Sequence, residues 1–218
     1  MKRLLRSRDA GIVLSLAALT LFCCTLIFTR IIYTGWVTFG FLLWNLCLAW
    51  IPFCLSLLIV EAVKRRAHRV ALIILAAVWL VFYPNAPYIL TDFIHLRERS
   101  NIPLWFDLVL IGSCAWNGLL LGFLSLHHLQ KLVQQTRGAF TGWVLVVCVQ
   151  LLSGFGIYVG RFLRWNSWDL LINLPSLSMD IASRIIEPQT IGVSVLFGVF
   201  LLLTYLTVWT LRNKNVQR

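Results

Sequence analysis

Six apolar stretches without a charged residue follow one another along the chain, and they constrain its fold more than any other feature. About 20 apolar residues in an α-helix cross the roughly 30 Å hydrocarbon layer of a membrane, and such a helix pairs its backbone polar groups internally. The sequence therefore predicts an all-α membrane fold, a six-span transmembrane helical bundle that forms one integral membrane domain over residues 1–218. The stretches cover residues 10–29, 36–60, 70–90, 108–126, 139–160 and 189–211.

The overall composition agrees with a membrane-embedded chain. Hydrophobic residues make up 60% of the sequence and charged residues 12%, whereas soluble domains have about 45–50% and about 25%. A net charge of +11 raises the question of nucleic acid, but a nucleic-acid binder gathers Lys and Arg on one folded face. Here the basic residues lie at the ends of the apolar stretches. We therefore expect the lipid bilayer, and no nucleic acid, as a partner.

The basic residues are divided unequally between alternate loops. Positive residues in short loops are retained on the cytoplasmic side of a membrane. This rule predicts that both termini are cytoplasmic. No A-x-A cleavage site follows the first stretch, so we expect this stretch to be an uncleaved span rather than a signal peptide. The loops on the other side carry six Lys or Arg and six acids. Of the 19 Lys and Arg residues, 13 lie in the segments 1–9, 61–69, 127–138 and 212–218.

Two prolines, Pro84 and Pro87, interrupt the third stretch. Each proline removes an amide donor and pushes the residue before it away from helical geometry, so we expect the backbone to break within the membrane. A second helical piece is expected to restart with Asn85 as its N-cap. A broken helix at membrane depth is tolerated only against protein or a water-filled cavity. A polar stripe on this piece is therefore expected to face inward, and it consists of Tyr88, Asp92, His95 and Arg99, at intervals of four, three and four.

A second polar cluster follows the fifth stretch. Arg161, Arg164 and Trp168 are spaced so that they share one face of a helix. Two guanidinium groups beside tryptophan can hold a phosphate or a carboxylate through paired hydrogen bonds. The alternative is an aromatic belt in which the arginines form salt bridges with Asp92, Asp107 or Asp169. After this cluster, residues 178–187 have the pattern of a short helix at the outer membrane surface.

Two motifs resemble a known family. They are FYPNAPYILTD with IHL at residues 82–96, and GRFLRWNSWD at residues 160–169. The sequence resembles an uncharacterised bacterial integral membrane family, domain of unknown function 1361, over roughly residues 35–210. The resemblance implies a multi-pass protein of the bacterial plasma (inner) membrane. It implies no particular activity.

The first functional hypothesis is a membrane enzyme or lipid-handling protein with a site on the extracytoplasmic side. Arg161 and Arg164 would hold a lipid-linked phosphate or another anionic ligand, while Asp92 and His95 supply acid/base chemistry. No cofactor is expected, and the six cysteines lack metal-ligand spacing, so no metal is expected either. The candidate residues are Asp92 and His95 as catalytic groups, and Asn85, Tyr88, Arg99, Arg161, Arg164, Asn166, Trp168 and Asp169 as ligand-binding groups.

Two further hypotheses remain open from the sequence. A small transporter is suggested by the broken third span together with Asn117 and Gln150, which are polar residues inside apolar stretches. The commoner role of such amides is hydrogen bonding between helices. A scaffold or partner subunit, with a membrane-protein partner or a homo-oligomer, is suggested by the glycine pairs 118/122 and 156/160, which favour close helix approach.

Overall fold

The computed structural model describes residues 7–98 and 102–214. Six of its helical segments are long and apolar enough to cross a membrane, which confirms the predicted all-α six-span fold. The helices extend past most of the apolar stretches, because polar residues near the span ends continue the helical ladder. The elements are α1 (Ser7–Thr34), α2 (Phe41–Lys64), α3 (Arg69–Phe82), α4 (Asn85–Tyr88), the 3₁₀ helix η1 (Ile89–His95), α5 (Leu104–Arg137), α6 (Ala139–Arg161), α7 (Asp169–Ile172), α8 (Leu174–Arg184) and α9 (Pro188–Lys214).

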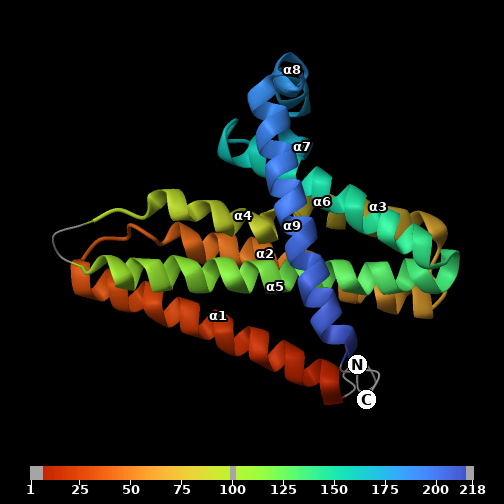
Figure 1. Cartoon of the computed structure of the whole chain (residues 1–218), viewed down its shortest axis with the longest axis horizontal. Coiled ribbons are helices and arrows are strands. Elements are labelled where there is room, and N and C mark those ends of the chain that lie inside the picture. The colour runs from red at the N-terminus through yellow and green to blue at the C-terminus, as the bar shows by residue number, and fades with distance from the viewer. Residues whose placement is uncertain (1–6, 99–101, 215–218) are drawn as a thin grey trace.

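Helix α5 is the centre of the bundle. It contacts α1, α2, α4, η1 and α6, and its apolar window is the most buried of the six spans. Figure 1 shows α1, α2 and α5 running along the long axis of the molecule, while α9 crosses at a steep angle. Helix α9 packs mainly on α6. Many large apolar side chains on the outer faces of the spans are exposed, as expected where lipid rather than water surrounds the helices.

The α-helix of the third span is interrupted at Tyr83 and Pro84, as predicted, but Tyr83 keeps helical backbone angles. The expectation that proline moves the preceding residue out of helical geometry is therefore wrong here, and the segment continues differently. Pro84, rather than Asn85, occupies the N-cap position of α4, so the predicted cap is wrong. The Asn85 amide instead donates to the Phe82 carbonyl at 3.0 Å and to Ser167 Oγ at 2.8 Å. After one α-helical turn the chain becomes the 3₁₀ helix η1. Because this helix has three residues per turn, side chains three positions apart lie above one another.

Four glycines provide the space in which the broken segment packs. A side chain on Gly118 would collide with the carbonyl oxygen of Ala86, and one on Gly156 would lie 2.7 Å from a ring carbon of Pro84. From the sequence, these glycine pairs are expected to allow close helix approach. The close approach is present, and both pairs contact the α4 segment of the same chain. The glycines are Gly118 and Gly122 of α5, and Gly156 and Gly160 of α6.

The two buried amides hold neighbouring helices together. Asn117 Nδ2 of α5 donates to Thr20 Oγ1 of α1 at 2.7 Å. Gln150 of α6 accepts a bond of 3.3 Å from the Tyr83 hydroxyl and donates to the Leu201 carbonyl of α9 at 3.4 Å. These contacts are the interhelical hydrogen bonds that polar residues inside spans commonly form.

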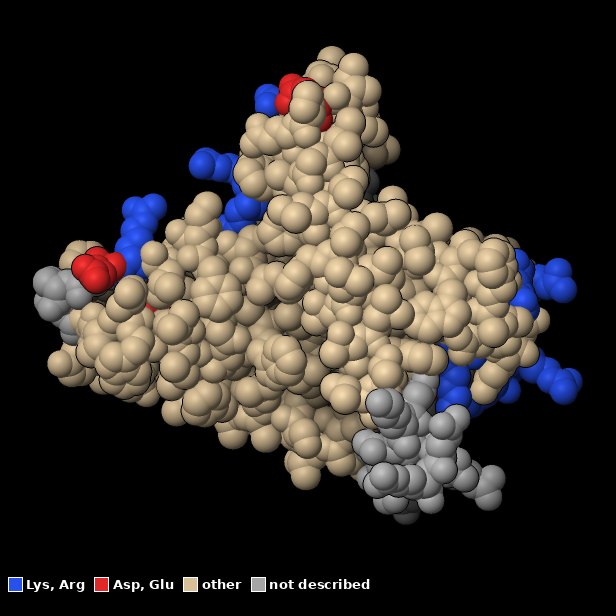
Figure 2. All heavy atoms as spheres, viewed as in Figure 1, with Lys and Arg blue, Asp and Glu red and all other residues tan. Residues whose placement is uncertain are grey.

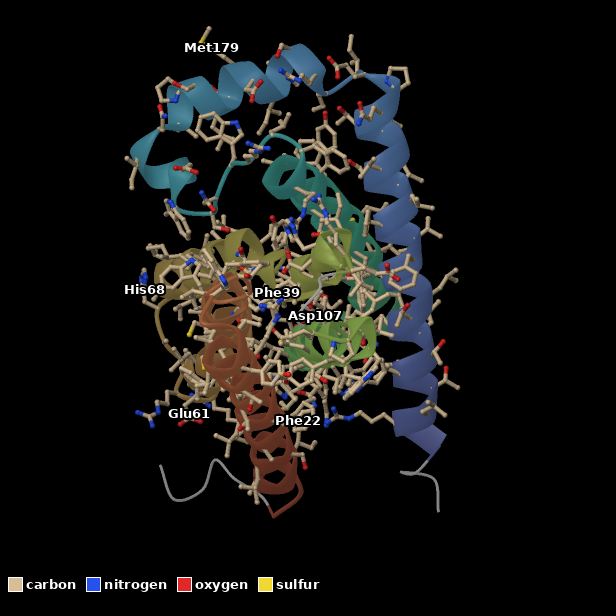
Figure 3. The ribbon with its side chains drawn as sticks, turned by 90° about the vertical axis from the view of Figure 1, so that its left-hand side faces the viewer. Phe22, Phe39, Glu61, His68, Asp107 and Met179 are labelled. Atoms are coloured by element: carbon tan, nitrogen blue, oxygen red, sulfur yellow. The ribbon has the colours of Figure 1, made fainter. Side chains whose placement is uncertain are left out.

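The short helix predicted over 178–187 is present as α8, which begins earlier and ends at Arg184. In Figure 3 this helix crosses the end of the bundle almost at a right angle to α9, and Met179 points away from the other helices. On the face shown in Figure 2, one end of the bundle carries only basic groups, whereas the opposite end and α8 carry both signs. The side of the membrane on which each end lies remains a prediction.

Candidate functional site

A cavity of about 540 Å³ lies beside the broken third span. Its wall comes from one side of α2, the end of α3, the α4–η1 segment, the second half of α6, and the chain that leads into α8. Among the lining residues, Asp92, His95 and Arg161 are in contact with one another and form what we call the polar end, and most of the other lining residues are aliphatic or aromatic. The cavity therefore has a polar part and an apolar part, which would match the two parts of an amphipathic ligand.

Arg161, the last residue of α6, organises the polar end. Its Nη2 forms an ion pair with Asp92, its Nε donates to Thr91 Oγ1 at 2.8 Å, and its Nη1 lies 3.2 Å from His95 Nε2. The guanidinium carbon lies 4.5 Å from the centre of the Tyr88 ring, which adds a cation–π contact. A cation at the carboxyl end of a helix is also stabilised by the helix dipole.

The 3₁₀ helix explains why two of these partners meet Arg161 together. Asp92 and His95 are three residues apart, and this spacing places them on one face of η1. Asp92 is fully buried, and its second oxygen accepts a hydrogen bond of 2.9 Å from Asn45 Nδ2 of α2. A buried carboxylate requires such partners because an unpaired charge at this depth is costly. Helices α2, η1 and α6 are thus joined through one carboxylate.

His95 is in contact with Arg161 on one side. A guanidinium group can only donate, so His95 Nε2 is the acceptor in this contact. The ring also packs edge-on against Phe41, with ring centres 5.3 Å apart. The polar end of the cavity therefore contains the Arg161–Asp92 ion pair with an imidazole beside it.

The apolar part of the cavity reaches the outer surface of the bundle. Leu80 of α3 and Leu152 of α6 both line the cavity, and they are 37% and 51% exposed. Both lie within spans, so this edge of the cavity opens toward the lipid rather than toward water. On another side, Leu177 and Ile181 of α8 cover the cavity. Helix α8 is held there by a bond of 2.9 Å from Trp165 Nε1 to an Asp180 carboxylate oxygen.

The structure brings together many, but not all, of the residues that the sequence singles out. Arg164 is exposed, has a left-handed backbone with φ of +61°, and does not line the cavity. The prediction that Arg161, Arg164 and Trp168 share a helical face is wrong, because α6 ends at Arg161. Arg99 lies outside the described residues. The predicted residues that line the cavity are Asn85, Tyr88, Asp92, His95, Arg161 and Asn166.

The remaining predicted residues support the cavity wall from outside. Trp168 packs against Trp44, with ring centres 6.0 Å apart. Asp169 accepts a hydrogen bond of 2.6 Å from the backbone N–H of Asn166 and so fixes the turn before α7. The salt-bridge alternative is therefore realised for Arg161 with Asp92, whereas Asp107 pairs with Arg30.

Three residues that contribute to the site were not predicted from the sequence. Asn45 is a lone amide inside the second stretch, and the rule that polar groups within spans need partners would have drawn attention to it. Thr91 carries no such signal, because hydroxyl groups in spans usually bond to their own helix, and Ser167 lies after the fifth span. Across the described ranges 7–98 and 102–214, no group of three His, Cys, Asp or Glu side chains is arranged to hold a metal ion.

The fold and the cavity define a polytopic α-helical membrane protein with a buried ion pair in a hollow between its spans. Residues 44–204 match the model of the family described as Protein of unknown function (DUF1361), and the chain belongs to this family. The match includes the whole α4–η1 segment and the end of α6, whereas α1 lies before it. No solved structure matches the chain.

Proposed function

We propose that the cavity binds a lipid-like molecule, with its headgroup beside Arg161 and its apolar chains toward the opening between α3 and α6. One observation carries this proposal: the polar end with its buried ion pair and the apolar opening at Leu80 and Leu152 belong to the same cavity. Ionisable groups at membrane depth usually mark functional sites. The cavity volume also falls within the roughly 300–1,000 Å³ typical of ligand pockets.

The opening toward lipid decides between a lipid and a water-soluble ligand. A molecule with acyl chains can enter sideways from the bilayer and leave its chains among the exposed leucines, so it gives up little apolar contact with lipid. A small polar solute would instead have to replace its hydration inside a wall that is mostly apolar, which costs free energy. The proposal includes a location. The excess of basic residues in alternate loops favours the extracytoplasmic side for the polar end, and the family resemblance favours a bacterial plasma membrane.

Acid/base chemistry on the bound headgroup is a second candidate function. It is favoured by the imidazole of His95, which is able to take up a proton beside the cavity. Asp92 would act mainly by holding Arg161 in place. Replacing His95 with alanine is expected to abolish turnover of the lipid while leaving its binding within about threefold of wild type. Equal loss of binding and turnover would contradict a chemical role.

The transporter and scaffold hypotheses receive less support from the contacts. Asn117 and Gln150 do not line the cavity, and both bond to neighbouring helices. The glycine pairs that suggested an external partner pack against α4 inside the chain. The lipid-binding proposal uses the observed cavity and requires neither a continuous pathway nor a second protein.

The proposal can be tested by identifying lipids that remain with the purified protein. The full chain would be purified in mild detergent, and bound lipids would be extracted and measured by mass spectrometry. Leu152→Trp narrows the opening and is expected to remove most of the bound lipid. Val147→Trp is the matched control, because Val147 is also an exposed residue of α6 but does not line the cavity. Equal lipid content in both variants, each folded, would refute lipid binding at this site.

A further inference from the structure

The charges at the polar end of the cavity cancel one another. Arg161 is paired with Asp92, and the nitrogen of His95 that lies 3.2 Å from Arg161 is a hydrogen-bond acceptor there. Arg164, the second cation expected for gripping a phosphate, is exposed and does not line the cavity. A phosphate placed here would add its negative charge beside an ion pair whose charges already cancel, and burying an uncompensated charge in a site of low dielectric is unfavourable.

The groups that remain available for hydrogen bonds in the cavity are mostly uncharged. Asn45, Asn85 and Tyr88 line the cavity. The Tyr88 hydroxyl and the two amide oxygens have no hydrogen-bond partner among the described residues. Asn166 also lines the cavity. Arg161 has one N–H on each terminal nitrogen beyond those it uses. Such a mixture of donors and acceptors suits hydroxyl groups, which donate and accept at the same atom.

Aromatic rings line the same cavity as these polar groups. Trp44 lines the cavity and is 56% exposed, and Trp168 packs against it edge to face. Trp165 also lines the cavity. A half-exposed indole offers a flat apolar face beside a polar rim, and this suits a ring that has C–H groups on its face and hydroxyl groups on its edge. A sugar ring has both features, whereas a phosphate has neither.

We propose that the headgroup recognised in this cavity is an uncharged glycosyl group, so that the ligand is a neutral glycolipid. This inference rests on the proposed lipid-binding function and specifies its ligand class. The amide oxygens of Asn45 and Asn85 accept from sugar hydroxyl groups, the Tyr88 hydroxyl and the free N–H groups of Arg161 complete the set, and the ring packs on Trp44. The Arg161–Asp92 pair stays intact and holds η1 against α6 while the ligand is bound.

Three probes with identical acyl chains separate the headgroup from the chains. They are a monoglucosyl diacylglycerol, a phosphatidic acid and a diacylglycerol, each titrated against the full chain in nanodiscs and followed by native mass spectrometry. The glucosyl lipid is expected to bind at least about tenfold more tightly than the other two, which corresponds to one or two net hydrogen bonds. Tyr88→Phe removes one hydroxyl and is expected to reduce that preference several-fold. Tyr33→Phe, at an exposed tyrosine away from the cavity, is the control and leaves the preference unchanged.

Each other outcome has a definite meaning. Tightest binding of phosphatidic acid would overturn the neutral headgroup and restore a phosphate ligand. If all three lipids bind equally and Leu152→Trp abolishes their binding, headgroup selection is overturned, while the proposed lipid-binding function stands. Binding of none of them above the level of the Leu152→Trp variant would refute both proposals. A preference for the glucosyl lipid that Tyr88→Phe leaves intact would place recognition outside this cavity and would also overturn the inference.

Discussion

The ion pair between Arg30 and Asp107 joins α1 to the bundle, and its removal should be costly. Arg30 Nε lies 2.7 Å from Asp107 Oδ1, and Arg30 Nη2 lies 3.2 Å from Oδ2. Both side chains are only 2% exposed. The guanidinium carbon also lies 4.5 Å from the centre of the Phe39 ring. Replacing one partner leaves a buried charge without its counterion, which typically costs about 3–5 kcal/mol.

A double-mutant cycle isolates this effect. Arg30→Met and Asp107→Leu should each lower the free energy of unfolding by about 3–5 kcal/mol, whereas the double variant should lose less than either single one, because no charge remains buried. Unfolding would be followed by tryptophan fluorescence in mixed micelles of increasing denaturing detergent. The surface pair of Arg65 and Glu61, whose side chains are 69% and 25% exposed, is the control. Arg65→Met should leave the free energy of unfolding nearly unchanged, because water screens an exposed pair.

Two results would refute this reasoning. Single variants that lose less than about 1 kcal/mol would show that water reaches the Arg30–Asp107 pair and screens it. A double variant that loses the full sum of the single losses would show that the two side chains act independently, through packing alone, rather than as a pair.

Three further changes test how the bundle is held together, with unfolding measured in the same micelle assay. Gly118→Leu should prevent folding or strongly destabilise the chain, since its side chain would collide with the α4 backbone, whereas Gly192→Leu has nothing within 4 Å and should be tolerated; equal effects would contradict this packing. Ser125→Ala should cost about 1–3 kcal/mol, because it leaves the buried Trp79 Nε1 without its acceptor at 2.6 Å, and a neutral result would mean that another acceptor is available. Trp165→Phe removes the bond that holds α8 over the cavity, so hydrogen exchange in α8 should become faster while the spans keep their protection.

The sequence alone was sufficient for the number of spans and for the break in the third one. Stretches without charge can only be accommodated in lipid, and the paired prolines leave few alternatives to a kink. It did not predict η1, because the choice between an α-helix and a 3₁₀ helix after α4 depends on how the segment packs between α5 and α6. Helix ends were also placed too early or too late, most clearly for α5, which continues to Arg137.

The candidate site was only partly predictable for a related reason. The spacing of Asp92 and His95 indicates a common face within one segment, and this spacing works in a 3₁₀ helix as well as in an α-helix. That Arg161 of another span would reach them, and that Arg164 would not, depends on where α6 ends. Contacts between segments far apart in the chain leave no local pattern, so the pairing of Arg30 with Asp107 was missed as well.

The separation of Arg161 and Asp92 by 69 positions has a consequence for biogenesis. During synthesis α2 emerges before η1, and α6 emerges well after η1. When Asp92 reaches the bilayer, Asn45 is therefore already present, whereas Arg161 has not yet been synthesised. The amide is then the first available donor, and the half-made chain carries an unneutralised acid until the fifth span is inserted. Truncated nascent chains that stop before α6 should therefore depend on insertion factors more strongly than chains that extend past it.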